Sequence, residues 1–247
     1  MKKMKGIILA GGTGSRLNPL TKATNKHLLP VGGVPMIYHP LMRLINAGVI
    51  EIMIITGTEH MGDMITTLGS GREFGCEITY KVQDMPNGIA GALLLCESFV
   101  GNDLFVVLLG DNIFENNFSR YIEKFQNIQT NSGIKSMLLL KKISDPERFG
   151  VATIKDGKIT KIIEKPKIPE SNLCVTGAYF YDKKVFDFIR ETKPSDRNEL
   201  EITDVNNRYV DLGSCYHDTL EGWWTDAGTH SSYNNANLFF INGDNKS

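Results

Sequence analysis

The stretch Gly6-Ile7-Ile8-Leu9-Ala10-Gly11-Gly12-Thr13-Gly14-Ser15-Arg16-Leu17 decides how the chain is organised. Its first half is an apolar run typical of a buried strand, and its second half is a glycine cluster followed by a basic residue. Small residues let a ligand approach the backbone, and consecutive N–H groups at such a turn can bind an anion. A glycine-rich turn can also simply connect a strand to a helix. From this stretch alone, that plainer interpretation is favoured.

Strands and helices alternate through the rest of the first half. We expect strands at 6–10, 51–56, 76–82 and 103–109, and helices at 34–47, 59–68 and 89–99. This alternation predicts right-handed βαβ units around a buried, mostly parallel sheet. In such sheets ligands bind beyond the carboxyl ends of the strands, where both the glycine cluster and Asp111 are expected.

The second half is less regular and predicts a mixed sheet. Strands are expected at 136–142, 149–154, 158–164, 173–181 and 213–218, with a hairpin turn at Asp156-Gly157. Helices are expected at 183–191, 201–210 and 229–240. Because no linker or repeat interrupts the chain, we expect a single domain over residues 1–247. Its fold class would be α/β, with a central mixed, mostly parallel sheet flanked by helices.

Composition excludes several classes of protein. The 247 residues are 41% hydrophobic with a net charge of -1, which is ordinary for a globular protein and gives no sign of a nucleic-acid partner. The four cysteines lack the spacing of a zinc site and indicate a reducing, cytoplasmic compartment. The first apolar run is too short for a signal peptide or a membrane span, so no membrane partner is expected.

The glycine cluster fits two common nucleotide motifs poorly. No Lys follows Gly14 as a P-loop requires, and Leu17 stands where the dinucleotide fingerprint needs its third glycine. Neither a P-loop ATPase nor an NAD dehydrogenase is therefore indicated. The remaining interpretation is a phosphate-binding loop with Arg16 and Lys26 near it, a combination that suits phosphoryl-type transfer.

Two carboxylates and one charged pair have both a functional and a plainer interpretation. Asp111 and Asp226 could each cap a helix, or together they could hold one Mg²⁺ ion. Glu164 and Lys165 could be an exposed strand end, or Lys165 could bind a phosphate while Glu164 accepts sugar hydroxyls. Among the five histidines, His27 is the one that we place near a ligand.

In combination, these segments resemble the sugar nucleotidyltransferases, and most closely a short form of the glucose-1-phosphate thymidylyltransferases. The resemblance extends from about Met4 to the closing helix. Its motifs are Leu9 to Leu17, Lys26-His27-Leu28-Leu29-Pro30, Gln83 to Ala90, Gly110-Asp111-Asn112, Arg148-Phe149-Gly150-Val151, Glu164-Lys165-Pro166, Val175-Thr176-Gly177, Glu199 to Asp204, and Trp224 to Thr229.

The resemblance implies a Rossmann-like nucleotidyltransferase fold and an Mg²⁺-assisted in-line displacement. The substrates would be dTTP and α-D-glucose 1-phosphate, and the products dTDP-glucose and pyrophosphate, on a route to dTDP-rhamnose or a related deoxysugar. No covalent nucleophile would be needed, because the attacking phosphate is already anionic. The alternatives are the same chemistry with UTP, since one Gln amide can serve both bases, or an inactive regulatory protein that binds nucleotide sugars.

The resemblance also implies roles for individual residues. Catalytic residues would be Arg16, Lys26, Asp111 and Lys165. The nucleotide would be bound by Leu9, Gly11, Gly12, Thr13, Gly14, Ser15, Arg16, Lys26, His27, Gln83, Pro86, Gly88 and Asp111. The sugar phosphate would be bound by Asn112, Gly150, Glu164, Lys165 and Val175, and the metal by Asp111 and Asp226.

Four positions depart from the pattern of the family. His27 stands where Gln is usual, Asn25 where Ser is common, Gly91 where Leu-Ala-Gln-Ala has its Gln, and Ala227 where Thr is common. We expect Gly91 to loosen discrimination between bases. The chain also ends soon after the closing helix, so we expect it to lack the secondary nucleotide site of longer members or to build that site differently. The sequence leaves open whether the protein is a homo-oligomer.

Overall fold

The computed structural model describes residues 3–244, and the chain divides into two compact units. Unit 1 comprises Met1–Lys5, Asn87–Val107 and Ser119–Glu221. Unit 2 comprises Gly6–Pro86, Leu108–Phe118 and Gly222–Ser247. Both units are assembled from segments that lie far apart in the sequence.

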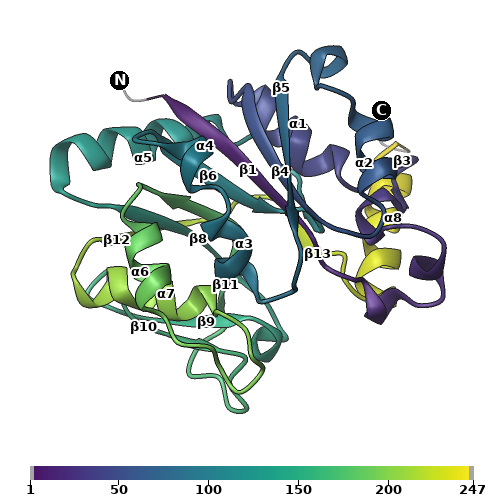
Figure 1. The fold of residues 1–247 in the computed structure, drawn as a ribbon. Helices are drawn as coiled ribbons and strands as arrows, with labels where there is room; N and C mark the ends of the chain where they lie inside the picture. Colours follow the sequence, from purple (N-terminus) through teal and green to yellow (C-terminus); the bar gives the residue numbers. More distant parts are fainter. Residues whose placement is uncertain (1–2, 245–247) are drawn as a thin grey trace. The chain divides into compact units, whose positions relative to one another are not determined.

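Three parallel strands form the sheet of unit 2. They are β1 (Met4–Ala10), β4 (Glu51–Gly57) and β5 (Glu77–Gln83), in the order β1-β4-β5 (Figure 1). Strands β1 and β4 are apolar along nearly their whole length because both of their faces are covered. The register pairs Ala10 with Thr56 and Gly57 with Gln83, so these strands end together at one edge of the sheet.

The other elements of unit 2 surround this sheet. They are η1 (Ser15–Leu17), η2 (Leu20–Lys22), η3 (Lys26–Leu28), β2 (Pro30–Val31), β3 (Val34–Pro35), α1 (Tyr38–Asn46), α2 (Met61–Leu68), η4 (Arg72–Phe74), β7 (Asn112–Phe114), β13 (Trp224–Asp226) and α8 (His230–Asp244). Helix α1 packs on β7, and α8 packs on β13 and β2. Strands β7 and β13 pair in antiparallel fashion.

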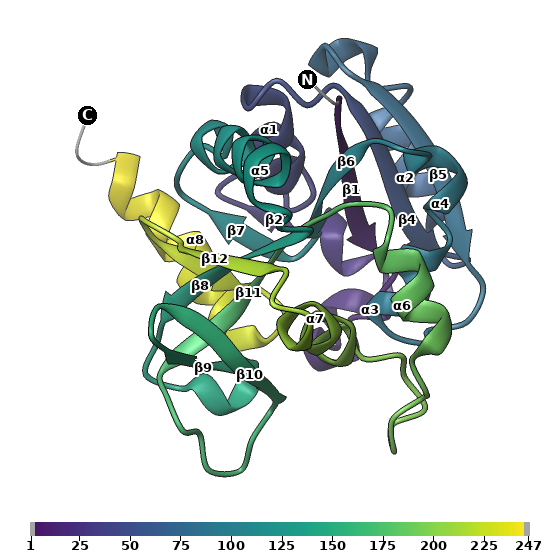
Figure 2. The ribbon, with the colours of Figure 1, turned by 90° about the vertical axis from the view of Figure 1, so that its left-hand side faces the viewer.

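Unit 1 contains the mixed part of the sheet. Its strands are β6 (Leu104–Leu109, of which Leu104–Val107 belong to this unit), β8 (Ser136–Lys142), β9 (Gly150–Lys155), β10 (Lys158–Glu164), β11 (Leu173–Tyr181) and β12 (Cys215–Thr219). Strands β10, β9, β11 and β6 follow one another, and β8 pairs with both β11 and β12. Its helices are α3 (Ile89–Leu94), α4 (Glu97–Val100), α5 (Ser119–Ser132), η5 (Pro146–Arg148), α6 (Val185–Glu191) and α7 (Ile202–Asp211). Helix α7 packs along β10 (Figure 2).

The structure corrects three expectations. The helix expected from residue 34 begins only at Tyr38, because Gly32 and Gly33 take positive φ and form the turn of the β2–β3 hairpin. The helix expected at 89–99 is broken: Leu95 and Cys96 donate to the carbonyl three residues earlier, which closes α3 before α4 begins. Helix α5 and strand β7 were not expected, and because β7 follows Asp111, this residue caps no helix.

The expected fold class is confirmed as α/β with a mixed, mostly parallel sheet and flanking helices. The hairpin at Asp156-Gly157 is present, with both residues at positive φ between β9 and β10. The single domain over residues 1–247 stays a prediction. Over the part of the chain that the structure describes, no helix combines the length and apolar character of a membrane span.

Candidate active site

The glycine cluster follows β1 directly and closely contacts Lys26. A Cβ on Gly14 would lie 2.9 Å from the Cβ of Lys26, and a Cβ on Gly12 would lie 3.3 Å from its Cε. Gly14 also has a φ of 67°, a left-handed conformation that glycine adopts without strain. Glycines at these positions therefore let the Lys26 side chain lie across the loop.

Lys26 forms a buried ion pair with Asp111. The Lys26 Nζ lies 2.5 Å from the Asp111 Oδ2, and each side chain is only 11% exposed. The other carboxylate oxygen, Oδ1, accepts a hydrogen bond of 3.0 Å from the Asn112 amide. The pair joins a loop near the amino end of the chain to the carboxyl end of β6.

Asp226 and Arg16 complete a compact charged cluster with this pair. Strand pairing sets Asp226 opposite Asn112, the residue after Asp111. A Cβ on Gly228 would lie 2.6 Å from the Asp226 Oδ1, 3.0 Å from an Arg16 guanidinium nitrogen and 3.4 Å from the Asp111 Oδ2. The structure thus brings together two carboxylates that the sequence could only name separately, around a space that a larger residue at 228 would fill.

The pKa values of the Asp111 and Asp226 carboxyl groups are shifted in opposite directions. Burial opposes ionisation of Asp111, but the charge of Lys26 and the hydrogen bonds from Lys26 and Asn112 outweigh it, so its pKa is well below the usual value. Burial raises the pKa of Asp226, and the neighbouring charge of Asp111 raises it further. A cation between them would relieve this repulsion.

The donor set fits a hard divalent cation. Carboxylate oxygens are the protein ligands that Mg²⁺ prefers, and this ion commonly uses one or two of them together with water and substrate phosphates. Between residues 3 and 244 there is no group of three or more His, Cys, Asp or Glu side chains arranged to hold a metal ion. Asp111 and Asp226 could therefore hold Mg²⁺ only as a pair.

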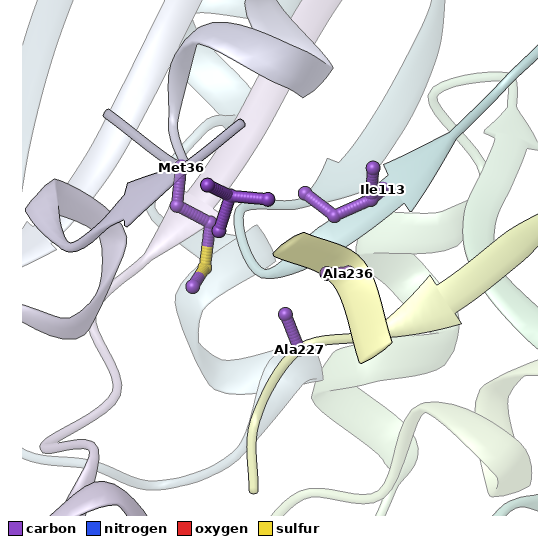
Figure 3. Packing of buried hydrophobic residues seen from close by; sticks show 5 residues of the cluster. Met36, Ile113, Ala227 and Ala236 are labelled. Atoms are coloured by element: carbon purple, nitrogen blue, oxygen red, sulfur yellow. The ribbon is translucent and has the colours of Figure 1, made fainter. Parts of the chain in front are cut away.

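A small apolar cluster lies beside these carboxylates in unit 2. It consists of Val31, Met36, Ile113, Ala227 and Ala236, all fully buried. Figure 3 shows Met36, Ile113, Ala227 and Ala236 around one common space. Ala227 immediately follows Asp226, and its N–H donates to the Asp111 carbonyl at 2.8 Å. The cluster therefore fixes the backbone that carries both aspartates, and its apolar surroundings suit Ala at position 227.

Gln83 reaches the glycine cluster from the neighbouring strands. It is the last residue of β5 and is paired with Gly57 on β4. Its side-chain Oε1 lies 2.9 Å from the position that a Cβ on Gly11 would take. Gly11 and Gly57 both leave room here, so the Gln83 side chain lies beside the loop. Its contact with a base stays a prediction, and Pro86 is exposed.

His27 is the expected nucleotide-binding residue whose side chain is least accessible. It is 1% exposed, and its Nδ1 lies 2.7 Å from the Asn25 Oδ1. Burial, followed by the charge of Lys26, lowers the pKa of His27 to about 3, so the ring is neutral. A contact of this ring with a nucleotide stays a prediction.

Unit 1 carries a second polar group around Glu164. Glu164 ends β10 and is paired with Gly150 on β9. Its Oε2 accepts a hydrogen bond of 2.6 Å from the Thr203 hydroxyl of α7, and a Cβ on Gly150 would lie 3.4 Å from the same oxygen. Gly150 thus leaves open space beside the carboxylate.

Two cations approach the other oxygen of Glu164. The Lys165 Nζ lies 3.6 Å and an Arg197 nitrogen 3.7 Å from the Glu164 Oε1. Arg197 also forms a bidentate pair with Glu201, with contacts of 2.8 and 3.2 Å. Sequence reasoning missed Arg197. The available signal was its place four residues before Glu201, in the segment that leads to Glu199-Leu200-Glu201.

The remaining expected residues lie in both units. Val175 is buried on β11 in unit 1. Asn112 belongs to unit 2, and its Oδ1 accepts a hydrogen bond of 2.8 Å from the Trp224 indole. The others in unit 2 are Leu9, which is buried, Gly11 and Gly14, which are partly exposed, and Gly12, Thr13, Ser15 and Arg16, which are exposed.

Comparison with known proteins assigns the chain to a family. Residues 5–243 match the family described as nucleotidyl transferase. The chain belongs to this family. A glucose-1-phosphate thymidylyltransferase of Neisseria meningitidis is 43% identical over 239 residues, 96% of this chain and 82% of the relative. One of Xanthomonas campestris is 42% identical over 97% of this chain and 81% of the relative. The chain is therefore a nucleotidyltransferase.

Solved structures of nucleotidyltransferases have the same fold. A Bacillus anthracis protein assigned as a glucose-1-phosphate thymidylyltransferase, solved in complex with a sucrose, is 58% identical with a TM-score of 0.91, covering 96% of this chain and 95% of its own. A UDP-glucose pyrophosphorylase with UDP-glucose is 26% identical with a TM-score of 0.82, covering 98% of this chain and all of its own. The resemblance and the reaction class inferred from the motifs are thus confirmed.

In this nucleotidyltransferase the Asn87 side chain occupies the space that a side chain at position 91 would take. A Cβ on Gly91 would lie only 2.1 Å from the Oδ1 of Asn87. Asn87 is held in place, because its carbonyl accepts a hydrogen bond of 2.8 Å from the Leu200 N–H. Gly88, between them at a φ of 94°, packs against the same Leu200 backbone. The glycine therefore makes room for Asn87.

Proposed function

We propose that this nucleotidyltransferase transfers a thymidylyl group from dTTP to α-D-glucose 1-phosphate, which yields dTDP-glucose and pyrophosphate. The observation that carries the proposal is the cluster of Arg16, Lys26, Asp111 and Asp226 beside the glycine loop. The names of the relatives support the choice of substrates.

The reaction needs little covalent chemistry from the protein. A phosphate oxygen of the sugar phosphate attacks the α-phosphorus of dTTP, a new P–O bond forms, and the bond from the α-phosphorus to the bridging oxygen breaks. That oxygen leaves with pyrophosphate and carries the electron pair. The attacking oxygen is already anionic, so no general base is required. The main barrier is repulsion between two polyanions, which cationic side chains and positioning reduce.

The residues of unit 2 would bind the nucleotide. Backbone N–H groups of the glycine cluster would bind the triphosphate, and Arg16 and Lys26 would offset the charge of the departing pyrophosphate. The Gln83 amide offers a donor and an acceptor, which match the O4 and N3–H of thymine. Gly11 and Gly57 would let the base approach the backbone beside this amide.

The residues of unit 1 would bind the sugar phosphate. We assign Lys165 to its phosphate and Glu164 to its hydroxyls, with Gly150 and Val175 lining the sugar. Arg197 is a second cation beside Glu164, and we include it with Lys165 as a phosphate ligand. Both cations are about half exposed, at 49% for Lys165 and 43% for Arg197, so an incoming anion can reach them.

Asp111 and Asp226 would hold Mg²⁺. When bound, the ion would neutralise charge on the phosphate oxygens. Lys26, which contacts the Asp111 Oδ2, would supply positive charge beside the same phosphates. We also propose a reducing, cytoplasmic compartment, on the scattered spacing of the four cysteines.

The alternative substrate is UTP. Uracil offers Gln83 the same donor and acceptor as thymine, and a UDP-glucose pyrophosphorylase shares the fold. Discrimination by the single C5 methyl group is worth only about 1–3 kcal/mol. An inactive regulatory protein is disfavoured, because the charged residues of both groups are retained.

Release of pyrophosphate provides the test. Purified protein is incubated with glucose 1-phosphate, Mg²⁺ and each of dTTP, UTP, CTP and GTP. We expect the highest kcat/KM with dTTP. A preference for UTP would replace the proposed substrate by the alternative, and a preference for CTP or GTP would contradict the role of Gln83. No release with any nucleotide would contradict the proposed reaction.

A further inference from the structure

The side chains of Asn25 and His27 are bonded to each other. The Asn25 Oδ1 accepts a hydrogen bond of 2.9 Å from the His27 backbone N–H. The same oxygen lies 2.7 Å from the His27 Nδ1. Because an oxygen can only accept here, Nδ1 carries a proton and donates it to Asn25. Asn25 therefore determines both the tautomer and the orientation of the ring.

The oriented ring packs against Gly110. A Cβ on Gly110 would lie 2.8 Å from the His27 Cδ2, 3.0 Å from the Leu9 carbonyl oxygen and 3.2 Å from the His27 Nε2. The Gly110 N–H is meanwhile bonded to the Leu9 carbonyl at 2.9 Å. The backbone before Asp111 is thus enclosed between the end of β1 and the imidazole ring.

The residue next to His27 contacts the residue next to Gly110. Lys26 is bonded to the carboxylate of Asp111, while His27 packs against Gly110. The dipeptide Lys26-His27 therefore contacts the dipeptide Gly110-Asp111 at two points. Both side chains of the Asn25–His27 pair are buried, at 8% and 1% exposed, and the ring is already bonded at Nδ1.

We propose that Asn25 and His27 form one coupled positioning device for Asp111. In this role His27 is a positioning residue, and its ring does not contact the nucleotide. The inference rests on the proposed function for its kinetic effect, since Asp111 is the proposed metal ligand.

A double-mutant cycle tests the coupling. The variants are Asn25→Ser, His27→Gln and the double variant, which carries the residues usual in the family. We expect each single variant to lower kcat about tenfold, with KM for dTTP changed less than threefold, because Asp111 is displaced while the nucleotide contacts remain. The double variant should recover to within about threefold of the parent. If the loss of kcat in the double variant equals the product of the losses in the two single variants, the two residues are not coupled and the proposal is wrong.

Packing against Gly110 is tested sterically. Gly110→Ala should lower the melting temperature and kcat, since its Cβ would meet the ring. Adding His27→Ala should restore part of both losses by removing the ring. If Gly110→Ala/His27→Ala is no better than Gly110→Ala, the ring is not the obstacle and the proposed packing is wrong. A rise in KM for dTTP, rather than a fall in kcat, in His27→Gln would instead indicate direct contact with the nucleotide and overturn the positioning role.

His39→Gln is the matched control. His39 is also a buried histidine of unit 2, but its Nε2 bonds to the Val31 carbonyl at 3.0 Å and its ring packs on Phe240. We expect this variant to lower the melting temperature with kcat unchanged. The melting temperatures of the cycle report the Asn25–His27 coupling without turnover. If the melting temperatures show coupling but the parent protein releases no pyrophosphate, the proposed function is wrong while the Asn25–His27 coupling stands.

Discussion

The two charged groups of this protein are built in opposite ways. In unit 2, the Lys26–Asp111 pair is 11% exposed on both sides and bonded at 2.5 Å. In unit 1, Glu164 is 29% exposed, and its two cations lie 3.6 and 3.7 Å away with about half of each side chain in solvent. The first group is fixed before any ligand arrives, whereas the second can adjust to a ligand.

This difference follows from the task proposed for each group. A metal and a triphosphate need charges at fixed positions, and a buried network supplies them without reorganisation. A sugar phosphate must enter and its product must leave, which cations that are half exposed and only loosely paired with Glu164 allow. Changes in the buried group should therefore reduce kcat strongly, and changes in the exposed group should mainly raise KM.

The largest effect is expected for Asp111→Asn. This change removes a proposed metal ligand and leaves Lys26 without its buried counter-charge, so we expect kcat to fall at least about 100-fold. Pyrophosphate release at saturating substrates measures it. Glu164→Gln is the counterpart in the exposed group and should lower kcat far less. Equal losses in the two variants would contradict the contrast between the groups.

A smaller but still large effect is expected for Gly228→Ala. The added Cβ would enter the space between Asp226, Arg16 and Asp111. Overpacking of this kind costs about 1–3 kcal/mol of folding stability. Because the added Cβ would also displace the charged side chains of the site, we expect kcat to fall about tenfold, which is about 1.4 kcal/mol of activation free energy. Gly213→Ala, at a glycine with no atom within 4 Å of the added Cβ but a φ of 62°, controls for loss of stability alone. Its kcat should match that of the parent protein.

Gly91→Gln tests whether Asn87 occupies the space of the family side chain. Because the added atoms would overlap Asn87, we expect a loss of about 1–3 kcal/mol in the free energy of unfolding. Chemical denaturation measures this loss. Asn87→Ala/Gly91→Gln should be more stable than Gly91→Gln alone. If Gly91→Gln is as stable as the parent, Asn87 does not restrict this position.

Arg197→Gln should affect substrate binding more than turnover. Exposed ion pairs contribute about 0.2–1 kcal/mol, so we expect KM for glucose 1-phosphate to rise about 2–5-fold. The KM for dTTP and kcat should stay within about twofold of the parent values. A large fall in kcat would show that Arg197 is as tightly integrated as Lys26. That outcome would remove the contrast between the two groups.

The smallest effect concerns pH. Burial lowers the pKa of His39 below its usual value of about 6.5, although its hydrogen bond to Val31 opposes this. Between pH 7 and pH 5 the unfolded chain takes up a proton that the folded protein excludes, so stability falls as the pH falls. Urea denaturation at both pH values should show a smaller fall for His39→Gln than for the parent. An unchanged pH dependence would mean that His39 titrates normally in the folded protein.

Much of the fold was predictable because its local signals agree. The apolar runs at β1, β4 and β6 and the turn at Asp156-Gly157 specify their structures without help from distant residues. The sequence pattern predicted the wrong structure in two stretches, each for a physical reason. Pro35 indicates a helix start, but Gly32 and Gly33 make a hairpin first. Helix α5 is strongly polar on average, which obscured the apolar residues Tyr121, Ile122 and Phe125 that recur at helical spacing.

The candidate site was predictable in its residue types but not in its geometry. The meeting of Asp111 and Asp226 depends on pairing between β7 and β13, two three-residue strands far apart in the sequence. The burial of His27 depends on Asn25 and Gly110, and neither partner is evident from local sequence. Arg197 was overlooked because its link to Glu164 joins segments that sequence patterns do not connect.

The discontinuous path of unit 2 has a consequence for how the protein is made. Its glycine loop, Lys26 and Asp111 are synthesised early, whereas Asp226 and α8 follow only after all of unit 1. A chain that stops after Glu221 would carry one carboxylate of the pair and none of the Ala227 and Ala236 packing. During translation, then, the two aspartates come together only near the end, and truncated products would lack the proposed metal site.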